Sequence, residues 1–162
     1  FVSVQYLAFN SLRLCASSRN ETMKELTNTT TFRVRFSEVD SLRIVWHGNF
    51  LKYFEDGRDA WASEFGFDFM EVFEKHGLLM PLASSHMAYK YPLRYNEIGL
   101  VETTFVNSSA AKMIFRFKIY NEDKTQLKAT GETVQVFMDA EHVLQLNTPG
   151  FFEVWKQKMG LV

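Results

Sequence analysis

The chain has 162 residues, of which 46% are hydrophobic and 15% aromatic, and its formal net charge at pH 7 is −1. This length and composition predict a single globular domain with a core of its own. The charge lacks the basic excess of a nucleic-acid-binding surface, so no nucleic-acid partner is expected. No apolar run approaches the roughly 20 residues of a membrane-spanning helix, so no membrane span is expected either.

The first residues are interpreted separately from the rest. The chain begins at Phe1, and its single cysteine, Cys15, lies in this part. One cysteine cannot form an intrachain disulfide and suits a reducing compartment, which favours a cytoplasmic location. We predict that residues 1–27 are an N-terminal extension, either a targeting-like leader or an extra element without chemistry. Residues 28–162 are predicted to form the single domain.

A strand is predicted around Phe32, Val34 and Phe36, because these apolar residues alternate with polar ones. The threonine-rich residues 27–31 before it are interpreted as a polar lead-in. Residues 37–46 break the alternation, which predicts a turn followed by a short apolar step through the interior.

A long amphipathic helix is predicted next, with Asn49 as its N-cap and Gly66 as its terminator. Its apolar face, at spacings of three and four residues, consists of Phe50, Tyr53, Phe54, Gly57, Trp61 and Phe65. A glycine in mid-helix costs about 1 kcal/mol relative to alanine. We therefore expect the helix to approach a sheet or a second chain closely at Gly57.

The remainder of the chain is mostly strand. A second helix is predicted over residues 68–76, and a terminal helix follows Pro149. The predicted strands cover residues 84–94, 100–106, 113–120 and 126–138. Sequential strands joined by tight turns predict an antiparallel sheet and an α+β fold. One small sheet and one helix leave apolar surface uncovered, which predicts a homodimer or homotetramer.

Several common catalytic motifs are missing from the sequence. The patterns G-x-S-x-G and G-x-G-x-x-G and the P-loop do not occur, and the four histidines lack the spacing of zinc ligands. No metal site is therefore expected.

Asp40 remains as a candidate catalytic residue, because it lies between a predicted strand and the predicted long helix, seven residues before His47. The first N–H groups of a helix are unpaired donors that carry partial positive charge, and they can hold a developing oxyanion. A carboxylate beside such donors can hydrolyse an activated acyl group, either as nucleophile or by activating water. The alternative, from the residues alone, is that Asp40 is an ordinary turn or cap residue.

The stretch that contains Asp40 is F-R-V-R-F-S-E-V-D-S-L-R-I-V-W-H-G-N-F-L-K-Y-F-E-D-G-R. It resembles the signature of the 4-hydroxybenzoyl-CoA thioesterase-like group of the hotdog superfamily, V-R-F-x-D-x-D-x-x-G-x-V-x-[HYN]-x-N-[YF]-x-x-[YW]-[FL]-E. The matching residues are Val34, Arg35, Phe36, Asp40, Val45, His47, Asn49, Phe50, Tyr53, Phe54 and Glu55.

This resemblance implies a hotdog fold, in which an antiparallel β-sheet wraps around one long central α-helix, with active sites at the interface of a dimer or tetramer. It implies an acyl-CoA or acyl-ACP thioester as substrate and no metal or redox cofactor. Asp40 would be the catalytic carboxylate, and the backbone N–H groups of His47 and Gly48 would polarise the thioester carbonyl. Trp46 and Asn49 are predicted to contact the substrate. A non-catalytic acyl-CoA-binding or regulatory protein of the same fold is the alternative.

Arg43 departs from the signature, which has glycine at this position. A residue other than glycine alters the backbone freedom of the turn and places a cation near the site. Either the loop has a different shape, or Arg43 contacts a substrate phosphate or carboxylate, or it is an exposed arginine on a slightly different turn. Glu38 replaces an aspartate of the signature and is expected to support the loop rather than act as a second acid.

Overall fold

The computed structural model describes residues 25–162, which form one antiparallel sheet and three α-helices. The elements are β1 (Leu26–Arg33), α1 (Phe50–Phe65), α2 (Phe69–His76), β2 (Leu82–Tyr89), β3 (Ile98–Val106), β4 (Lys112–Asn121), β5 (Leu127–Val136) and α3 (Gly150–Met159). Two short 3-10 turns, η1 (Phe36–Glu38) and η2 (His47–Asn49), flank the turn that holds Asp40. Cys15 and most of the predicted extension lie outside the described residues, and the domain boundary at residue 27 stays a prediction.

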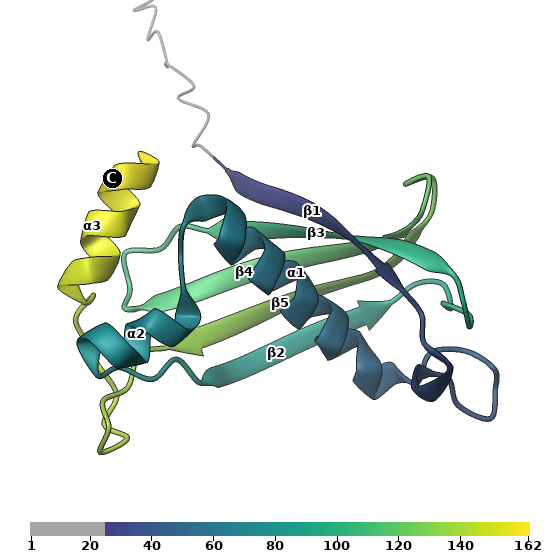
Figure 1. The fold of residues 1–162 in the computed structure, drawn as a ribbon, viewed down its shortest axis with the longest axis horizontal. Helices are drawn as coiled ribbons and strands as arrows, with labels where there is room; N and C mark the ends of the chain where they lie inside the picture. Colours follow the sequence, from purple (N-terminus) through teal and green to yellow (C-terminus); the bar gives the residue numbers. More distant parts are fainter. Residues whose placement is uncertain (1–24) are drawn as a thin grey trace, which may run out of the picture.

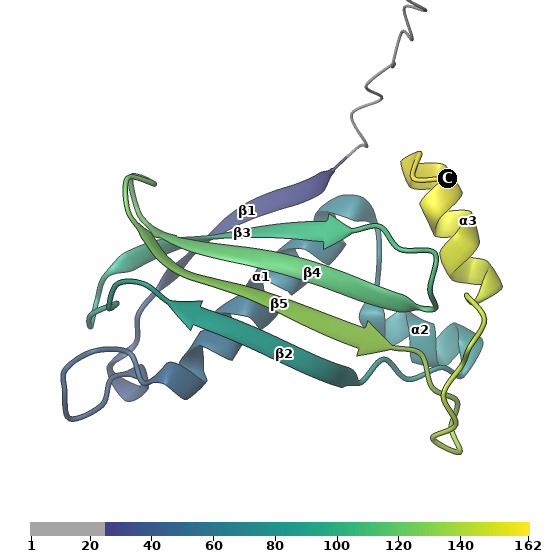
Figure 2. The ribbon, with the colours of Figure 1, turned by 180° about the vertical axis from the view of Figure 1, so that it is seen from behind.

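The five strands lie in the order β1-β3-β4-β5-β2, and every neighbouring pair is antiparallel. Figure 1 shows α1 crossing one face of this sheet, with α2 and α3 gathered at one end. Seen from behind, in Figure 2, the strands pass in front of α1, and none of the helices within residues 25–162 covers them. The predicted α+β hotdog arrangement, a sheet wrapped around one long helix, is therefore confirmed.

The central helix packs on the sheet through the predicted apolar face. Phe50, Tyr53, Phe54 and Trp61 are all buried. At Gly57 a Cβ atom would lie only 2.5 Å from Thr103 Oγ1 and 3.0 Å from Val101 Cγ2. The expected close approach of helix and sheet is thus confirmed, because any side chain at position 57 would push them apart.

Aromatic side chains fill the core at the C-terminal end of α1. The ring of Trp61 lies 4.8 Å from that of Phe115 and 5.6 Å from that of Trp155 on α3. The indole N–H of Trp61 donates to Leu26 O at 2.9 Å, and that of Trp155 donates to Phe65 O at 3.0 Å. Large rings whose polar edges are satisfied stabilise this end of the helix strongly. The opposite end of α1 is where the chain builds the candidate site.

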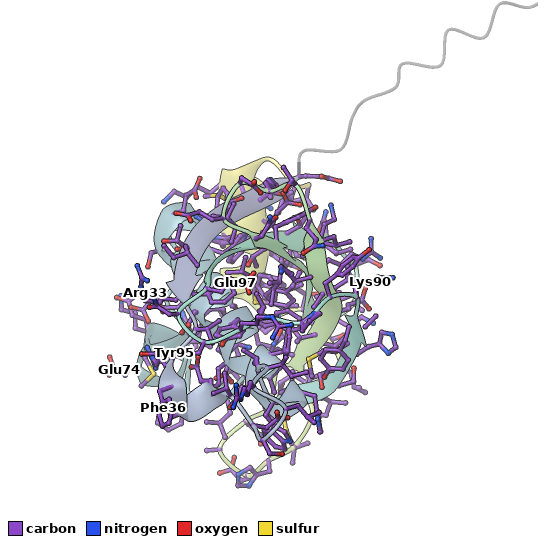
Figure 3. All side chains as sticks on the ribbon, turned by 90° about the vertical axis from the view of Figure 1, so that its right-hand side faces the viewer. Arg33, Phe36, Glu74, Lys90, Tyr95 and Glu97 are labelled. Atoms are coloured by element: carbon purple, nitrogen blue, oxygen red, sulfur yellow. The ribbon has the colours of Figure 1, made fainter. Side chains whose placement is uncertain are left out.

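The first strand differs from the prediction. Residues 27–31, interpreted as a lead-in, belong to β1 and pair with β3, because β-branched threonine suits the pleated backbone of an edge strand. The predicted strand position of Phe36 is wrong, since the pairing ends at Arg33 and Phe36 lies in η1 with 77% of its surface exposed. Its ring makes an edge contact with Tyr95 at 5.9 Å, and Figure 3 shows the two residues at the same edge of the molecule.

The prediction of a strand over residues 84–94 is too long at its C-terminal end, because β2 ends at Tyr89. The N–H groups of Lys90 and Tyr91 both donate to Lys128 O, and Leu93 then turns fully into the core. Within residues 25–162 no helix has the length and apolarity needed to span a bilayer.

Candidate active site

Asp40 lies in a tight hairpin that joins η1 to η2. The N–H of Asp40 donates to Ile44 O at 2.9 Å, and the N–H of Arg43 donates to Asp40 O at 2.9 Å. Arg43 has a φ of 59°, in the left-handed region. A three-residue hairpin loop that ends in a left-handed residue is a standard connection, and glycine is the usual residue there. Arg43 therefore adopts the backbone conformation that a glycine would, and its side chain is exposed.

Replacing Arg43 with glycine is expected to stabilise the protein by about 0.5–1 kcal/mol. The left-handed conformation costs a residue with a Cβ atom about 1–2 kcal/mol, and the greater freedom of glycine in the unfolded chain offsets part of this gain. Urea denaturation measures the difference in unfolding free energy. Arg43→Ala is the matched control, because it removes the same side chain and keeps the strain. A glycine variant less stable than the alanine variant would contradict this account of the turn.

The carboxylate of Asp40 is half-buried, and one of its oxygens holds the turn. Oδ1 accepts a hydrogen bond from the N–H of Leu42 at 2.8 Å. The other oxygen, Oδ2, accepts no hydrogen bond from any residue in the described range. One oxygen thus fixes the side chain, while the second remains available to a substrate or a water molecule.

Glu38 holds the base of the hairpin from within. Its side chain is 4% exposed, and Oε2 accepts from the N–H of Arg35 at 2.8 Å and from Tyr53 Oη at 2.7 Å. Its backbone carbonyl accepts from the N–H of Trp46 and from Asn49 Nδ2, both at 2.9 Å. Glu38 therefore supports the loop, as expected.

Asn49 differs from its predicted role as a side-chain N-cap. It is buried and precedes α1, but its side chain makes no capping hydrogen bond. Its side-chain amide instead donates to Glu38 O, and this hydrogen bond connects the helix start to the hairpin. The predicted contact of Asn49 with substrate stays a prediction.

Tyr53 links the hairpin to the first turns of α1. Its ring stacks on Phe32 at 4.0 Å, and its hydroxyl donates to Glu38. Burial, reinforced by the neighbouring Glu38 carboxylate, raises the pKa of Tyr53 far above its ordinary value. The hydroxyl therefore stays a neutral donor to Glu38 across the pH range in which proteins of ordinary stability are folded.

The start of the helix presents two backbone donors. The first hydrogen bond of η2 runs from the N–H of Asn49 to Trp46 O at 2.9 Å. The N–H groups of His47 and Gly48 come before it and have no acceptor among residues 25–162, as is general for the first donors of a helix. The peptide of His47 is held from the other side, because Tyr89 Oη on β2 donates to His47 O at 3.2 Å.

Trp46 covers Gly48. Its ring, with 48% of the residue's surface exposed, lies where a Cβ atom at position 48 would be, so only glycine leaves room for it. The indole also lies 4.8 Å from the ring of His47. The two predicted oxyanion donors therefore lie beside an aromatic surface that solvent reaches.

Two cavities flank α1. One, of about 390 Å³, lies between α1 and β1 and is lined in part by Phe32, Glu38 and Tyr53. The other, of about 150 Å³, lies between α1 and strands β2 and β5. Asp40 lines neither cavity. Within the described part of the chain, no three His, Cys, Asp or Glu side chains gather closely enough to hold a metal ion.

The structure thus brings the predicted residues to one end of α1, on a hairpin and a helix start that are hydrogen-bonded to each other. It also adds Tyr53 and Tyr89, which the sequence did not single out for this site. Tyr53 was assigned to the apolar face of the helix and matched the family signature, but it was given no role in the site, and nothing local to Tyr89 indicates that β2 passes the helix start.

Comparison with known proteins agrees with this architecture. Residues 34–153 match the family described as Thioesterase-like superfamily. YneP of Bacillus subtilis (strain 168), provisionally named as an acyl-CoA thioesterase, is 35% identical over 104 residues, which are 64% of this chain and 75% of YneP.

Two solved structures are similar in fold. A 1,4-dihydroxy-2-naphthoyl-CoA thioesterase from Synechocystis superimposes with a TM-score of 0.73 at 18% identity, over 83% of this chain and 98% of that one. The 4-hydroxybenzoyl-CoA thioesterase from Pseudomonas sp. strain CBS-3 gives a TM-score of 0.68 at 18% identity, over 80% of this chain and 98% of that one. The family match covers both the hairpin of Asp40 and the sheet around α1, and the chain therefore belongs to the thioesterase-like superfamily of hotdog proteins.

Proposed function

We propose that this protein hydrolyses acyl-CoA thioesters, with Asp40 as the catalytic carboxylate and the N–H groups of His47 and Gly48 as donors to the thioester oxygen. One observation carries the proposal. The hairpin that holds Asp40, with one carboxylate oxygen unpaired, continues directly into a helix start with two unpaired backbone donors. The family match and the name of the Bacillus subtilis relative support the same reaction class.

The proposed reaction adds water across the C–S bond. The oxyanion that forms at the carbonyl would be held by the two N–H donors, where a preorganised dipole is worth several kcal/mol. Asp40 would either take a proton from the attacking water or attack the carbonyl itself and form an anhydride that water then cleaves. Both routes break the C–S bond, pass a proton to the thiolate and release a carboxylic acid and free CoA.

Trp46, Asn49 and Arg43 are proposed to contact the substrate around this centre. The exposed ring of Trp46 lies beside the donors, where it can pack against the thioester or the pantetheine arm. The cation of Arg43 projects from the turn toward solvent, where a phosphate of CoA or of acyl-ACP would be accessible to it. No residue of the proposed mechanism needs a cofactor.

The direct test is the release of free thiol from acyl-CoA esters by the purified protein. We expect turnover of at least one member of a panel of short, long and aromatic acyl groups. Binding of acyl-CoA without thiol release across the whole panel would contradict the proposal and favour a non-catalytic acyl-CoA-binding protein instead.

We also infer that two copies of the chain associate through β2. This strand lies at an edge of the sheet, and its residues Leu82–His86 are exposed. Its sequence, LASSHMAY, contains none of the lysine, acidic or proline residues that usually protect a free edge. Sedimentation equilibrium of the purified protein should give a dimer or tetramer mass, and a monomer mass at micromolar concentration would overturn the inference.

A further inference from the structure

One side chain from the sheet is bonded to the peptide that carries a proposed oxyanion donor. Tyr89, the last residue of β2, donates from Oη to His47 O at 3.2 Å. Met87 Sδ lies 3.8 Å from the same hydroxyl. A hydroxyl has one proton, and a carbonyl oxygen is a better acceptor than a thioether, so the proton goes to His47 O. The end of β2, which Figure 1 shows on the same side of the molecule as the start of α1, thus holds that start through one peptide oxygen.

The hydroxyl of Tyr89 is itself held from two sides. The backbone of Tyr89 lies opposite Ala129 of β5, and this pairing fixes the end of the strand. Its ring meets the ring of Phe50 edge to face at 5.0 Å, and Phe50 is the buried first residue of α1. Such ring pairs have a preferred geometry. The hydroxyl therefore has a fixed position beside His47, although almost half of the residue's surface is exposed.

The carbonyl of His47 and the N–H of Gly48 belong to the same peptide unit. Peptide units are planar, and none within residues 25–162 is cis, so this N–H points in the direction opposite to the carbonyl. A hydrogen bond to the oxygen therefore fixes the direction of the N–H. The same oxygen also accepts from the N–H of Phe50, so both of its lone pairs are used. Polarisation of the oxygen strengthens the N–H as a donor, because hydrogen bonds in a chain reinforce one another.

The turn that carries this peptide is held only weakly by its own hydrogen bonds. It is η2, a single 3-10 turn, in which hydrogen-bond geometry is poorer than in an α-helix. Gly48 has no Cβ atom, so steric contacts restrict the rotation of the peptide less than at other residues. The preceding peptide, which carries the N–H of His47, is held within the turn, because Trp46 O accepts from the N–H of Asn49 at 2.9 Å. The N–H of Gly48 is thus the donor that gains support from the sheet.

We propose that Tyr89 is a positioning residue for thioester hydrolysis, whose hydroxyl aligns the N–H of Gly48 with the thioester oxygen and strengthens it as a donor. This inference rests on the proposed thioesterase function. Loss of one oxyanion donor lowers kcat by about 10²- to 10³-fold, so loss of a support that leaves the donor in place should lower kcat by roughly tenfold. KM should change by less than about twofold, because the donor acts mainly on the charge that develops in the transition state.

Tyr89→Phe tests the proposal, because phenylalanine keeps the ring on Phe50 and removes only the hydroxyl. Thiol release from acetyl-, decanoyl- and benzoyl-CoA gives kcat and KM, and thermal unfolding checks that the fold is retained. Tyr91→Phe is the matched control, since Tyr91 is a similarly exposed tyrosine just beyond the end of β2. It should leave both constants unchanged. An unchanged kcat in Tyr89→Phe, or a rise in KM without a fall in kcat, would overturn the proposal.

An infrared measurement separates alignment of the donor from a general loss of structure. Each of the three esters carries ¹³C at its carbonyl carbon and is bound to the Asp40→Asn variant, in which hydrolysis should be slow. Hydrogen bonds to the carbonyl oxygen lower its stretching frequency relative to that of the free ester. Adding Tyr89→Phe should make this shift smaller, whereas adding Tyr91→Phe should not. An equal shift with and without the Tyr89 hydroxyl would contradict its positioning role.

The positioning role and the thioesterase function can fail separately. A carbonyl shift that depends on Tyr89, without thiol release from any ester, would support the positioning role and refute hydrolysis. Thiol release whose kcat and carbonyl shift are both independent of Tyr89 would support hydrolysis and refute the positioning role. Neither thiol release nor a carbonyl shift with any of the three esters would refute both.

Discussion

Replacing Asp40 with asparagine is expected to lower kcat for acyl-CoA hydrolysis by about 10²- to 10⁴-fold, the usual contribution of a general base. Asparagine keeps an oxygen that can accept from the N–H of Leu42, so the turn and the fold should persist. It loses the negative charge and the basicity that either proposed route requires. Thiol release under saturating acyl-CoA measures the effect, and thermal unfolding checks that the fold is retained. Asp40→Ala should lower thiol release at least as much as Asp40→Asn and also lose the turn hydrogen bond.

Asp68→Asn provides a matched control for this substitution. Asp68 lies directly before a helix, and, like that of Asp40, its Oδ1 accepts from backbone N–H groups, those of Met70 at 2.8 Å and Glu71 at 3.1 Å. It is the same chemical change in a capping residue at the start of α2. Full activity in this variant would show that the loss at Asp40 is specific. Unchanged turnover in both Asp40 variants would instead refute the proposed mechanism.

Replacing Glu38 with alanine is expected to destabilise the protein by about 3 kcal/mol, because hydrogen bonds to a charged group contribute about 1.5–3 kcal/mol and their loss leaves two donors without this acceptor. The two donors concerned are the hydroxyl of Tyr53, a residue that is 2% exposed, and the N–H of Arg35. The same substitution removes the side-chain hydrogen bonds that hold the base of the Asp40 hairpin. Thiol release should therefore fall even at temperatures where the variant is folded. Urea denaturation gives the change in unfolding free energy.

A double-mutant cycle separates the two donors. Tyr53→Phe removes the hydroxyl and keeps a ring to stack on Phe32. With Glu38 already changed to alanine, the loss of the hydroxyl should cost little, so the two changes should be less than additive. Glu38→Gln, which keeps an acceptor, should lose less stability than Glu38→Ala. Strict additivity of Glu38→Ala and Tyr53→Phe would show that the buried hydrogen bond does not stabilise the hairpin.

The sequence alone was sufficient for features that depend on local patterns. The apolar spacing along α1, the left-handed Gly66 that ends it and the tight packing at Gly57 were predicted and are confirmed. The apolar spacing and the end of the helix depend on backbone conformation or on side chains a few residues apart, which sequence spacing records directly. The turn around Asp40 was found for the same reason. The close approach at Gly57 is a contact with Val101 and Thr103 of β3, and the sequence indicated it only because glycine is costly in mid-helix.

Features that depend on contacts between distant segments needed the tertiary structure. Alternation alone placed Phe36 in a strand, whereas the end of the pairing with β3 at Arg33 decides that it is exposed. The Asn49 side chain was expected to cap its own helix, but the buried carbonyl of Glu38 provides an acceptor inside the fold.

The same division applies to the site as a whole. The sequence determined that an acid precedes a helix start, because those residues are adjacent in the chain. Only the folded sheet decided that Tyr89 of β2 holds the His47 peptide. The two residues are 42 positions apart and are brought together by strand order, which side-chain spacing along one segment does not encode.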